Sequence, residues 1–107
     1  MEKYIQVITT TAAKMDAEKI AAFLVEKRLA ACVQIVGPVQ STYRWQGKIE
    51  QAEEWQCLIK SRQDLFGDLE QVIKQIHPYE LPEIIALPIV ESSTDYRQWL
   101  RDELLAT

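Results

Sequence analysis

The sequence is short of several residue types, and each shortage excludes a class of protein. Its 107 residues include one histidine, two cysteines and three glycines. The cysteines, Cys32 and Cys57, do not form a Cys-x-x-Cys pair, which excludes zinc-ribbon and thioredoxin-type motifs. We therefore expect both thiols to be free and buried, as is usual in a reducing cytoplasm.

The chain has no cluster of Lys and Arg and no long apolar run. Its formal net charge is −4, which makes it a poor partner for nucleic acid or an anionic membrane. The longest apolar run, residues 84–90, is too short to span a bilayer, and no signal peptide is visible. These features predict a cytoplasmic protein that binds neither nucleic acid nor membrane.

Motifs of catalysis are also missing. The sequence has no Gly-rich phosphate loop, no Gly-x-Ser-x-Gly and no histidine beside a local nucleophile motif. An acid–base pair of His77 and Glu80 stays open, but nothing in the sequence names a substrate for it. We therefore predict a protein that is not an enzyme and has no organic cofactor.

What is present is enough for one packed core. Hydrophobic residues make up 48% of the chain and charged residues 26%, so disorder is not expected. A chain of this length corresponds to one compact domain, and we assign residues 1–107 to it.

The pattern of apolar residues predicts four strands and three helices. The strands cover residues 4–9, 31–45, 48–61 and 84–87. The first helix covers residues 14–29. The second runs from an N-cap at Asp64 to His77, and the third begins after a cap at Ser92 or Ser93. The strand at 84–87 is expected to be buried on both faces. Four side chains of the last helix are expected to face the core: Tyr96, Trp99, Leu100 and Leu104.

The second and third strands form an unusually long hairpin around Gln46-Gly47. Gly37-Pro38 interrupts the second strand, and such a pair indicates a bulge or bend. If Gln46-Gly47 is a two-residue turn, Cys57 faces Val36 and Cys32 faces Ser61. The two thiols are then roughly 13 Å apart along the ladder, which is too far for a disulfide.

The element order is β-α-β-β-α-β followed by a helix. Two right-handed crossovers joined by a hairpin give an α+β ferredoxin-like plait, with a C-terminal helix added. Both crossover helices cover one face of a four-stranded antiparallel sheet. The other face and the hairpin stay exposed in one subunit, which predicts an obligate oligomer.

Candidate ligands lie on the loop between the second helix and the last strand. His77, Glu80 and Glu83 could bind a metal through imidazole and carboxylate groups. The alternatives are that His77 bonds a nearby carbonyl at the helix end, and that Glu80 pairs with a lysine. Lys60 is the lysine we expect to pair with Glu80, or it could hold an anion. Three aromatic residues could line a pocket or pack between subunits: Tyr43, Trp45 and Tyr79.

Three separated blocks resemble the CutA divalent-cation-tolerance family. They are Lys27-Arg28-Leu29-Ala30-Ala31-Cys32, Tyr43-Arg44-Trp45-Gln46-Gly47-Lys48 and His77-Pro78-Tyr79-Glu80. The resemblance implies a cytoplasmic homotrimer of ferredoxin-like subunits that are joined through their long hairpins. It also implies a link to copper and other divalent cations, and a fold and trimer similar to those of PII signalling proteins. No enzymatic reaction is established for the family.

One position departs from the family pattern. Some members carry a cysteine just after the first strand, where this chain has Thr9. A hydroxyl is a poor substitute for a thiolate, so a Cu(I) site at this position is not expected. Oxygen and imidazole ligands remain, and they suit Cu(II), Zn(II) or Ni(II).

These observations lead to two hypotheses for the function. The first is a trimeric, non-enzymatic protein of divalent-cation tolerance that binds Cu(II) or another divalent cation weakly between subunits, around His77 and Glu83. The second is a PII-like signalling or scaffolding trimer whose cleft takes a small ligand or a protein partner.

Overall fold

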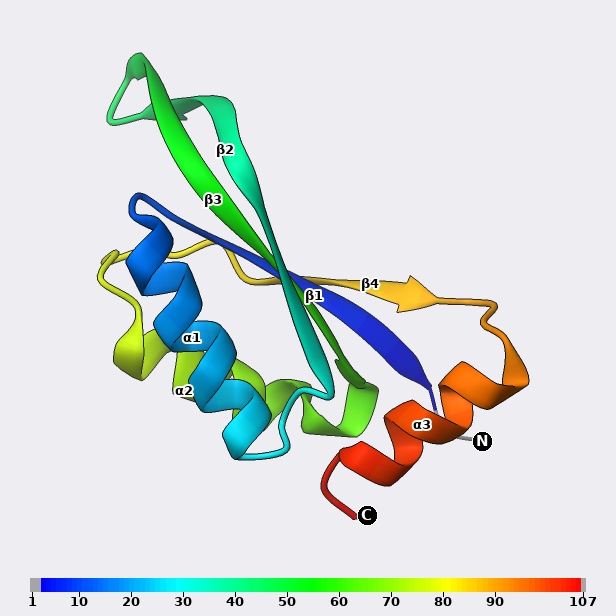
Figure 1. The fold of residues 1–107 in the computed structure, drawn as a ribbon. Coiled ribbons are helices and arrows are strands. Elements are labelled where there is room, and N and C mark those ends of the chain that lie inside the picture. The colour runs from blue at the N-terminus through cyan, green and yellow to red at the C-terminus, as the bar shows by residue number, and fades with distance from the viewer. Residues whose placement is uncertain (1–2, 107) are drawn as a thin grey trace.

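A computed structural model describes residues 3–106 of the chain (Figure 1). The strands are β1 (Tyr4–Thr11), β2 (Cys32–Trp45), β3 (Lys48–Arg62) and β4 (Ile85–Ile89). The helices are α1 (Lys14–Glu26), a 3₁₀ turn η1 (Gln63–Leu65), α2 (Phe66–Ile76) and α3 (Thr94–Glu103). Among the described residues, no helix has the length and apolar character needed to cross a membrane.

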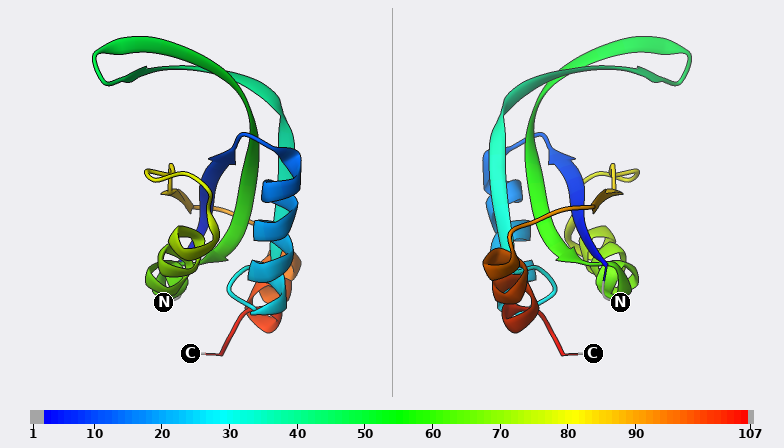
Figure 2. Two further views of the ribbon diagram at one scale, coloured as in Figure 1. Left: turned by 90° about the vertical axis from the view of Figure 1, so that its left-hand side faces the viewer. Right: turned by 90° about the vertical axis from the view of Figure 1, so that its right-hand side faces the viewer.

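The four strands form one antiparallel sheet in the order β2-β3-β1-β4. Helices α1 and α2 lie on one face of it, and α3 lies on the other face at one end (Figure 2). This order and layering confirm the predicted ferredoxin-like plait with an added helix. We call the face away from α1 and α2 the open face.

Alternation along β1 and β3 separates the core from the open face. Ile5, Val7 and Thr9 of β1 are buried and face the same side as Cys57 and Ile59 of β3. That side is the helix side, because the Cys57 thiol donates to the carbonyl of Ala17 in α1. Fully buried apolar residues of both helices complete this core: Ala17, Ile20, Leu24, Leu69 and Ile73.

The hairpin register shifts by one residue at the predicted bulge. Trp45 pairs with Lys48 and Val39 pairs with Glu54, as expected, but Val36 then pairs with Gln56. The extra residue is in β2, where Gly37 and Pro38 stand opposite a single residue of β3.

The predicted partners of the two thiols are therefore wrong by one position. Cys57 faces Ile35 and Cys32 faces Lys60. Because side chains alternate along a strand, Cys57 points to the helices while Cys32 lies on the open face. The sheet itself separates the two thiols, which is a stronger barrier to a disulfide than their distance along the ladder.

Two predicted helix boundaries also change. Helix α1 ends at Glu26 rather than at residue 29, because Arg28 adopts a φ of 60°. The amides of Arg28 and Leu29 then donate to the carbonyls of Val25 and Leu24, which is a Schellman motif without glycine. Helix α2 begins after the 3₁₀ turn, and its N-cap residue makes no side-chain hydrogen bond.

Two predictions of burial are wrong for the single chain. In β4, Ile85 and Leu87 are 46% and 47% exposed, because β4 is an edge strand and its open face is uncovered. In α3, Ser93 caps the helix as expected, and Leu100 and Leu104 are buried. The rings of Tyr96 and Trp99, however, are 41% exposed and pack on each other instead.

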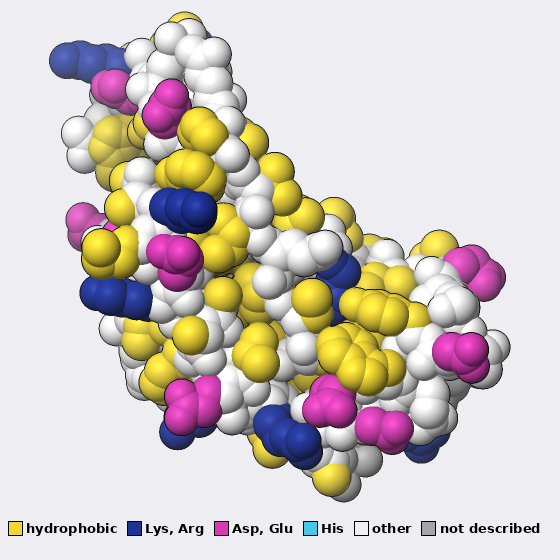
Figure 3. Space-filling model, in the orientation of Figure 1, with side chains coloured by type: hydrophobic (Ala, Val, Ile, Leu, Met, Phe, Trp, Pro, Cys, Tyr) yellow, Lys and Arg dark blue, Asp and Glu magenta, His cyan; other side chains and the backbone are white. Residues whose placement is uncertain are grey.

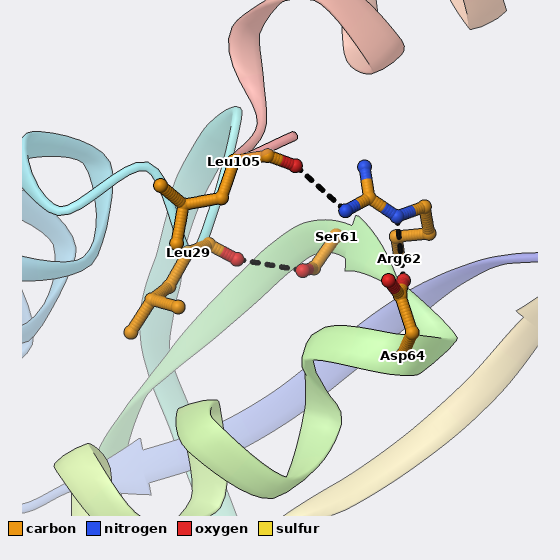
Figure 4. Close-up of polar contacts among 5 residues, drawn as sticks. All are labelled: Leu29, Ser61, Arg62, Asp64 and Leu105. Atoms are coloured by element: carbon orange, nitrogen blue, oxygen red, sulfur yellow. Dashed lines mark hydrogen bonds and ion pairs between the residues drawn. The ribbon is translucent and has the colours of Figure 1, made fainter. Parts of the chain in front are cut away.

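A set of polar contacts holds the end of α3 against the sheet (Figure 4). The guanidinium of Arg62, in a residue only 3% exposed, donates to the carbonyl of Leu105 at 2.7 Å and to the carboxylate of Asp64. The amide of Leu105 donates to the carbonyl of Arg28, and Arg28 pairs with Glu103. We call these contacts the C-terminal clasp. Asp64 therefore contributes to the clasp and does not act as the predicted N-cap of α2.

Gly37 generates the first testable prediction. A Cβ on Gly37 would lie 2.6 Å from Cε3 of Trp55, so Gly37→Ala must displace this ring from its place beneath the Lys14 ammonium. Overpacking of this kind typically costs about 1–3 kcal/mol, and we expect Gly37→Ala to lower the midpoint of chemical unfolding. Gly67→Ala is the control, because a Cβ there meets nothing within 4 Å. Equal midpoints for the two variants would contradict the close packing of Gly37 on Trp55.

The thiols give a second prediction. Burial raises the pKa of the Cys57 thiol to about 11, and the residue is 0% exposed, so a thiolate forms rarely and reagents cannot reach it. We expect Cys57 to resist a polar thiol reagent under native conditions and to react after denaturation. Site-resolved mass spectrometry gives the rate at each cysteine. Native labelling of Cys57 at the rate of the denatured chain would show that the core opens readily at this strand.

Candidate functional site

The candidate site is built on the loop from residue 77 to residue 84, between α2 and β4. Pro78 ends α2 because it cannot continue a helix, and the amide of His77 makes the last helical bond, 2.8 Å to the carbonyl of Ile73. His77 itself has an extended backbone and is only 7% exposed. The loop therefore begins with a buried imidazole.

Both ring nitrogens of His77 are hydrogen-bonded. The backbone amide of Tyr79 donates to Nδ1 at 3.0 Å, and Nε2 lies 2.7 Å from the carbonyl oxygen of Thr10. An atom that accepts an N–H cannot carry a hydrogen of its own, so Nε2 carries it and donates to Thr10. A metal could bind His77 in this arrangement only after one of these two bonds had opened.

Tyr79 reaches from the loop to the sheet. Its hydroxyl donates to the Glu54 carboxylate at 2.8 Å, and Glu54, in β3, is 8% exposed. Burial raises the pKa of the Tyr79 phenol far above its usual range, and the hydrogen bond and negative charge of Glu54 raise it further. The negative charge of Asp16, and that of Tyr43 once it is ionised, act in the same direction. The phenol therefore stays protonated and remains a donor.

Glu83 adds a second carboxylate to this region. Glu83 is an exposed residue, but partial burial of its carboxyl raises the pKa of Glu83, and the negative charge of Glu54 raises it further. We call Glu54, Tyr79 and Glu83 the acidic cluster. Its oxygen atoms are donors of the kind that divalent cations bind. Within residues 3–106, however, no group of three or more His, Cys, Asp or Glu side chains is close enough to hold a metal.

The other predicted site residues lie elsewhere. Glu80 is exposed, and Lys60 donates to the side-chain oxygen of Gln34 on β2, so the expected Lys60–Glu80 ion pair is not among the salt bridges of the described residues. Tyr43 and Trp45, near the hairpin tip, are 44% and 43% exposed. The structure thus brings together His77, Tyr79 and Glu54, whereas Glu83 lies on the same loop with an exposed side chain.

Sequence reasoning missed the two residues that complete this arrangement, Glu54 and Thr10. Glu54 follows another glutamate in a strand and looks like a solvated residue until the sheet is assembled. Thr10 contributes only its backbone carbonyl, which leaves no trace in the side-chain pattern. The one available signal was the alternation of side chains along each strand, which puts Glu54 and Thr10 on the open face of the sheet.

Thr9 lies apart from the acidic cluster. It is 0% exposed, pairs with Cys57 and faces the helices, while Thr10 lies on the opposite face. Its hydroxyl oxygen has no hydrogen-bond partner among the described residues. Thr9 lies within β1, in agreement with the strand predicted over residues 4–9, and inside the core.

Comparisons with known proteins agree with the fold. The "Divalent-cation tolerance protein CutA" of Thermus thermophilus is 45% identical over 96 residues, which cover 90% of this chain and 93% of that protein. The human "Protein CutA" is 44% identical over 85 residues, which cover 79% of this chain and 48% of that protein. This chain therefore matches about half the length of its human relative.

Solved structures give the same result. The Thermus thermophilus divalent cation tolerance protein superposes with a TM-score of 0.90 at 43% identity, covering 97% of this chain and 99% of that one. CutA1 from Oryza sativa superposes with a TM-score of 0.95 at 34% identity, covering 98% and 96%. A relative from Archaeoglobus fulgidus, 36% identical with a TM-score of 0.88 over 96% and 98% of the two chains, is named periplasmic.

The match to the family itself extends over nearly the whole described chain, from residue 5 to residue 103. It includes every strand and helix of the plait and the loop that carries His77, Tyr79 and Glu83. Together with the identity to the Thermus thermophilus protein, this match means that the chain belongs to the CutA1 divalent ion tolerance protein family.

Proposed function

We propose that this protein binds divalent cations at the acidic cluster and takes part in the tolerance of copper and other divalent cations. The observation that carries the proposal is the carboxylate of Glu54, a residue only 8% exposed, which has the Tyr79 hydroxyl 2.8 Å away. Burial raises the pKa of Glu83, and the negative charge of Glu54 raises it further; a bound cation would offset this repulsion between the two carboxylates. The family name supplies the class of ion.

The predicted ligands enter this proposal in different ways. Glu83 supplies a carboxylate from the loop, Glu80 lies three residues before it on the same loop, and Glu54 supplies a carboxylate from β3. Two or three carboxylates with a phenol make an incomplete set, so water or a neighbouring chain must complete it, and binding is weak. Oxygen ligands accept Cu(II), Zn(II) and harder ions such as Mn(II). The binding is non-enzymatic and needs no organic cofactor.

The protein acts as a homotrimer in this proposal. Apolar side chains gather around β4 and α3 on the side of the molecule that Figure 3 shows. Val36, Ile85 and Leu87 on the open face are each more than 40% exposed, as are Tyr43 and Trp45 of the hairpin. A patch of this kind favours association, and edge strands β2 and β4 offer unpaired backbone groups to a neighbour.

The cellular location stays a prediction. Free thiols and an acidic composition favour the cytoplasm. The PII-like alternative, a signalling or scaffolding trimer, differs in its ligand. Thermal stabilisation by a nucleotide, with none by any divalent cation, would favour that alternative over cation binding.

Glu83→Gln tests the cation site. Because its folded pKa is raised, ionised Glu83 opposes folding: its favourable contribution is present below the unfolded pKa, about 4.3, and is lost as pH rises through the folded value. We expect the metal-free variant to melt above the parent at pH 7 and level with it near pH 4. Added Cu(II), Zn(II) or Mn(II) should raise the melting temperature of the parent more than that of the variant.

Glu91→Gln is the matched control, since Glu91 is exposed and lies outside the cluster. It should melt like the parent with and without cations. If Glu83→Gln gains as much from every cation as the parent does, the cluster is not the binding site.

Trp45→Ala tests the trimer. Trp45 is 43% exposed in one chain, so its burial requires a neighbour. Loss of a large buried aromatic costs about 3–5 kcal/mol, and assembly and folding are linked by mass action. We expect the variant to dissociate at low concentration in sedimentation velocity and to melt earlier. Met15→Ala, which removes a side chain 64% exposed on α1, should change neither. A Trp45→Ala trimer as stable as the parent would refute a role for the hairpin tip in assembly.

A further inference from the structure

We infer that α3 is a strap that opens from the sheet as a unit, about a hinge at residues 90–93, while the four strands stay paired. The C-terminal clasp is the latch that holds the strap closed. Segments that open locally have few buried apolar side chains and irregular connections to the rest of the fold. The inference concerns a motion of the fold, and it depends on neither the proposed cation site nor the proposed trimer.

The first step is the course of the chain between the two edges of the sheet. Strand β4 is one edge and β2 is the other. The chain leaves β4 after Ile89, and the amide of Leu105 donates to the carbonyl of Arg28, just ahead of β2. Residues 90–105 therefore cross from one edge of the sheet to the other, and α3 lies on the open face at one end (Figure 2).

The second step is the bonding at the start of the strap. The hinge residues belong to no helix or strand, and Val90 is 80% exposed. The hydroxyl oxygen of Ser93 accepts from the amide of Tyr96. The hydroxyl oxygen of Ser92 accepts from Nε of Arg97. Both bonds join the hinge to α3 itself, so they move with the helix and opening does not break them.

The third step is that the ties between α3 and the sheet gather at the C-terminal end of the helix. Leu100 and Leu104 are 1% and 2% exposed. The rings of Tyr96 and Trp99, which are nearer the hinge, are 41% exposed and pack on each other. The clasp forms at the same end as the buried leucines. A strap that is fastened at the end farther from its hinge opens by release of that end.

The fourth step is that the latch opens without leaving a charge unpaired. The guanidinium of Arg62, a residue only 3% exposed, donates to the Leu105 carbonyl and to the carboxylate of Asp64. Asp64 lies in η1, outside the strap, so its ion pair with Arg62 persists when α3 leaves. Water then replaces the carbonyl of Leu105 as the second acceptor, which keeps the cost of opening below that of stranding a buried donor.

Opening of the strap changes the surface that the open face presents. It exposes Leu100 and Leu104 and gives water access to Arg62. This happens at the end of the sheet where Lys60 pairs with Cys32 of the edge strand β2. The strap therefore controls how much of the open face is available to another molecule.

Native-state hydrogen exchange of the unmodified protein, read by mass spectrometry of its peptides, tests the motion. After correction for intrinsic rates, the amides of α3 should exchange together and roughly tenfold or more faster than those of β1 and β3, which exchange only when the sheet unfolds. Equal rates for α3 and the two central strands would overturn the inference.

Gly37→Ala separates opening of the strap from unfolding of the whole chain. Gly37 packs on Trp55 in the hairpin, and this contact stays intact when only α3 opens. The variant should therefore speed exchange in β1 and β3 and leave exchange in α3 unchanged. If exchange in α3 speeds by the same factor as in the strands, α3 opens only when the whole chain unfolds, and the inference is wrong.

Arg62→Lys tests the latch. Lysine keeps the charge but lacks the planar fork that reaches two acceptors at once. Loss of a hydrogen bond to a charged group corresponds to roughly 10–100-fold in an equilibrium, and exchange in α3 should speed by about that factor. Arg44→Lys is the matched control, because Arg44 is exposed near the hairpin tip, and it should leave α3 unchanged. Unchanged exchange of α3 in Arg62→Lys would show that the clasp is not the latch.

Leu104→Ala tests the same end of the strap if Arg62→Lys does not fold. It removes a side chain that is 2% exposed and leaves every polar contact of Arg62 in place. Truncation of a buried leucine should speed exchange in α3 by roughly 30-fold or more. Exchange in α3 at the rate of the parent would show that the strap is not fastened at this end.

Discussion

The pairing of β1 with β3 is the constraint on which the rest of the molecule depends. Its register runs from Tyr4 opposite Arg62 to Thr11 opposite Trp55. At one end it places Arg62 where the C-terminal clasp forms, and at the other it places Thr10 beside the residues around Glu54. A shift of one residue would turn every side chain of β1 to the opposite face. It would bring Thr9 to the acidic cluster and move Thr10 into the core.

The two faces of this strand pair have different chemistry for the same reason. The helix side carries Val7, Thr9, Cys57 and Ile59, and its polar side chains are small hydroxyl residues such as Thr9 and Ser61. The open side carries the Thr10 carbonyl contact to His77 and the Glu54 carboxylate. A buried carboxylate is tolerated there because the Tyr79 hydroxyl donates to it. The acidic cluster is thus a property of one face of the sheet.

How far the sequence predicts this structure depends on the range of each interaction. Strand alternation and helix periodicity are local, so the element order, the bulge at Gly37-Pro38 and the cap at Ser93 could be predicted, and they are confirmed. The register beyond the bulge could not, because a Gly-Pro pair indicates a bulge or bend without telling how many residues it leaves unpaired. The end of α1 was missed because Arg28 occupies a conformation that usually signals glycine.

Only part of the candidate site could be predicted from the sequence, for a related reason. His77, Tyr79 and Glu83 are close in sequence and were found together, whereas Glu54 is 25 residues from Tyr79 and joins it only through the fold. Burial was overestimated in β4 and α3, because an apolar residue at an edge and an apolar residue in a core look alike in a sequence. Ile85 and Trp99 are exposed because no other element of the single chain covers them.

The C-terminal clasp has a consequence for how the chain is synthesised. Arg62 is buried, yet its acceptor at Leu105 is 43 residues further along the chain. At a translation rate of roughly 5–20 residues per second, Arg62 waits about 2 to 9 seconds for that carbonyl to be made. Until then, of its two acceptors in the clasp, Arg62 has only the Asp64 carboxylate, two residues away. The contact that ties the end of α3 to β3 can therefore form only after synthesis has passed residue 105.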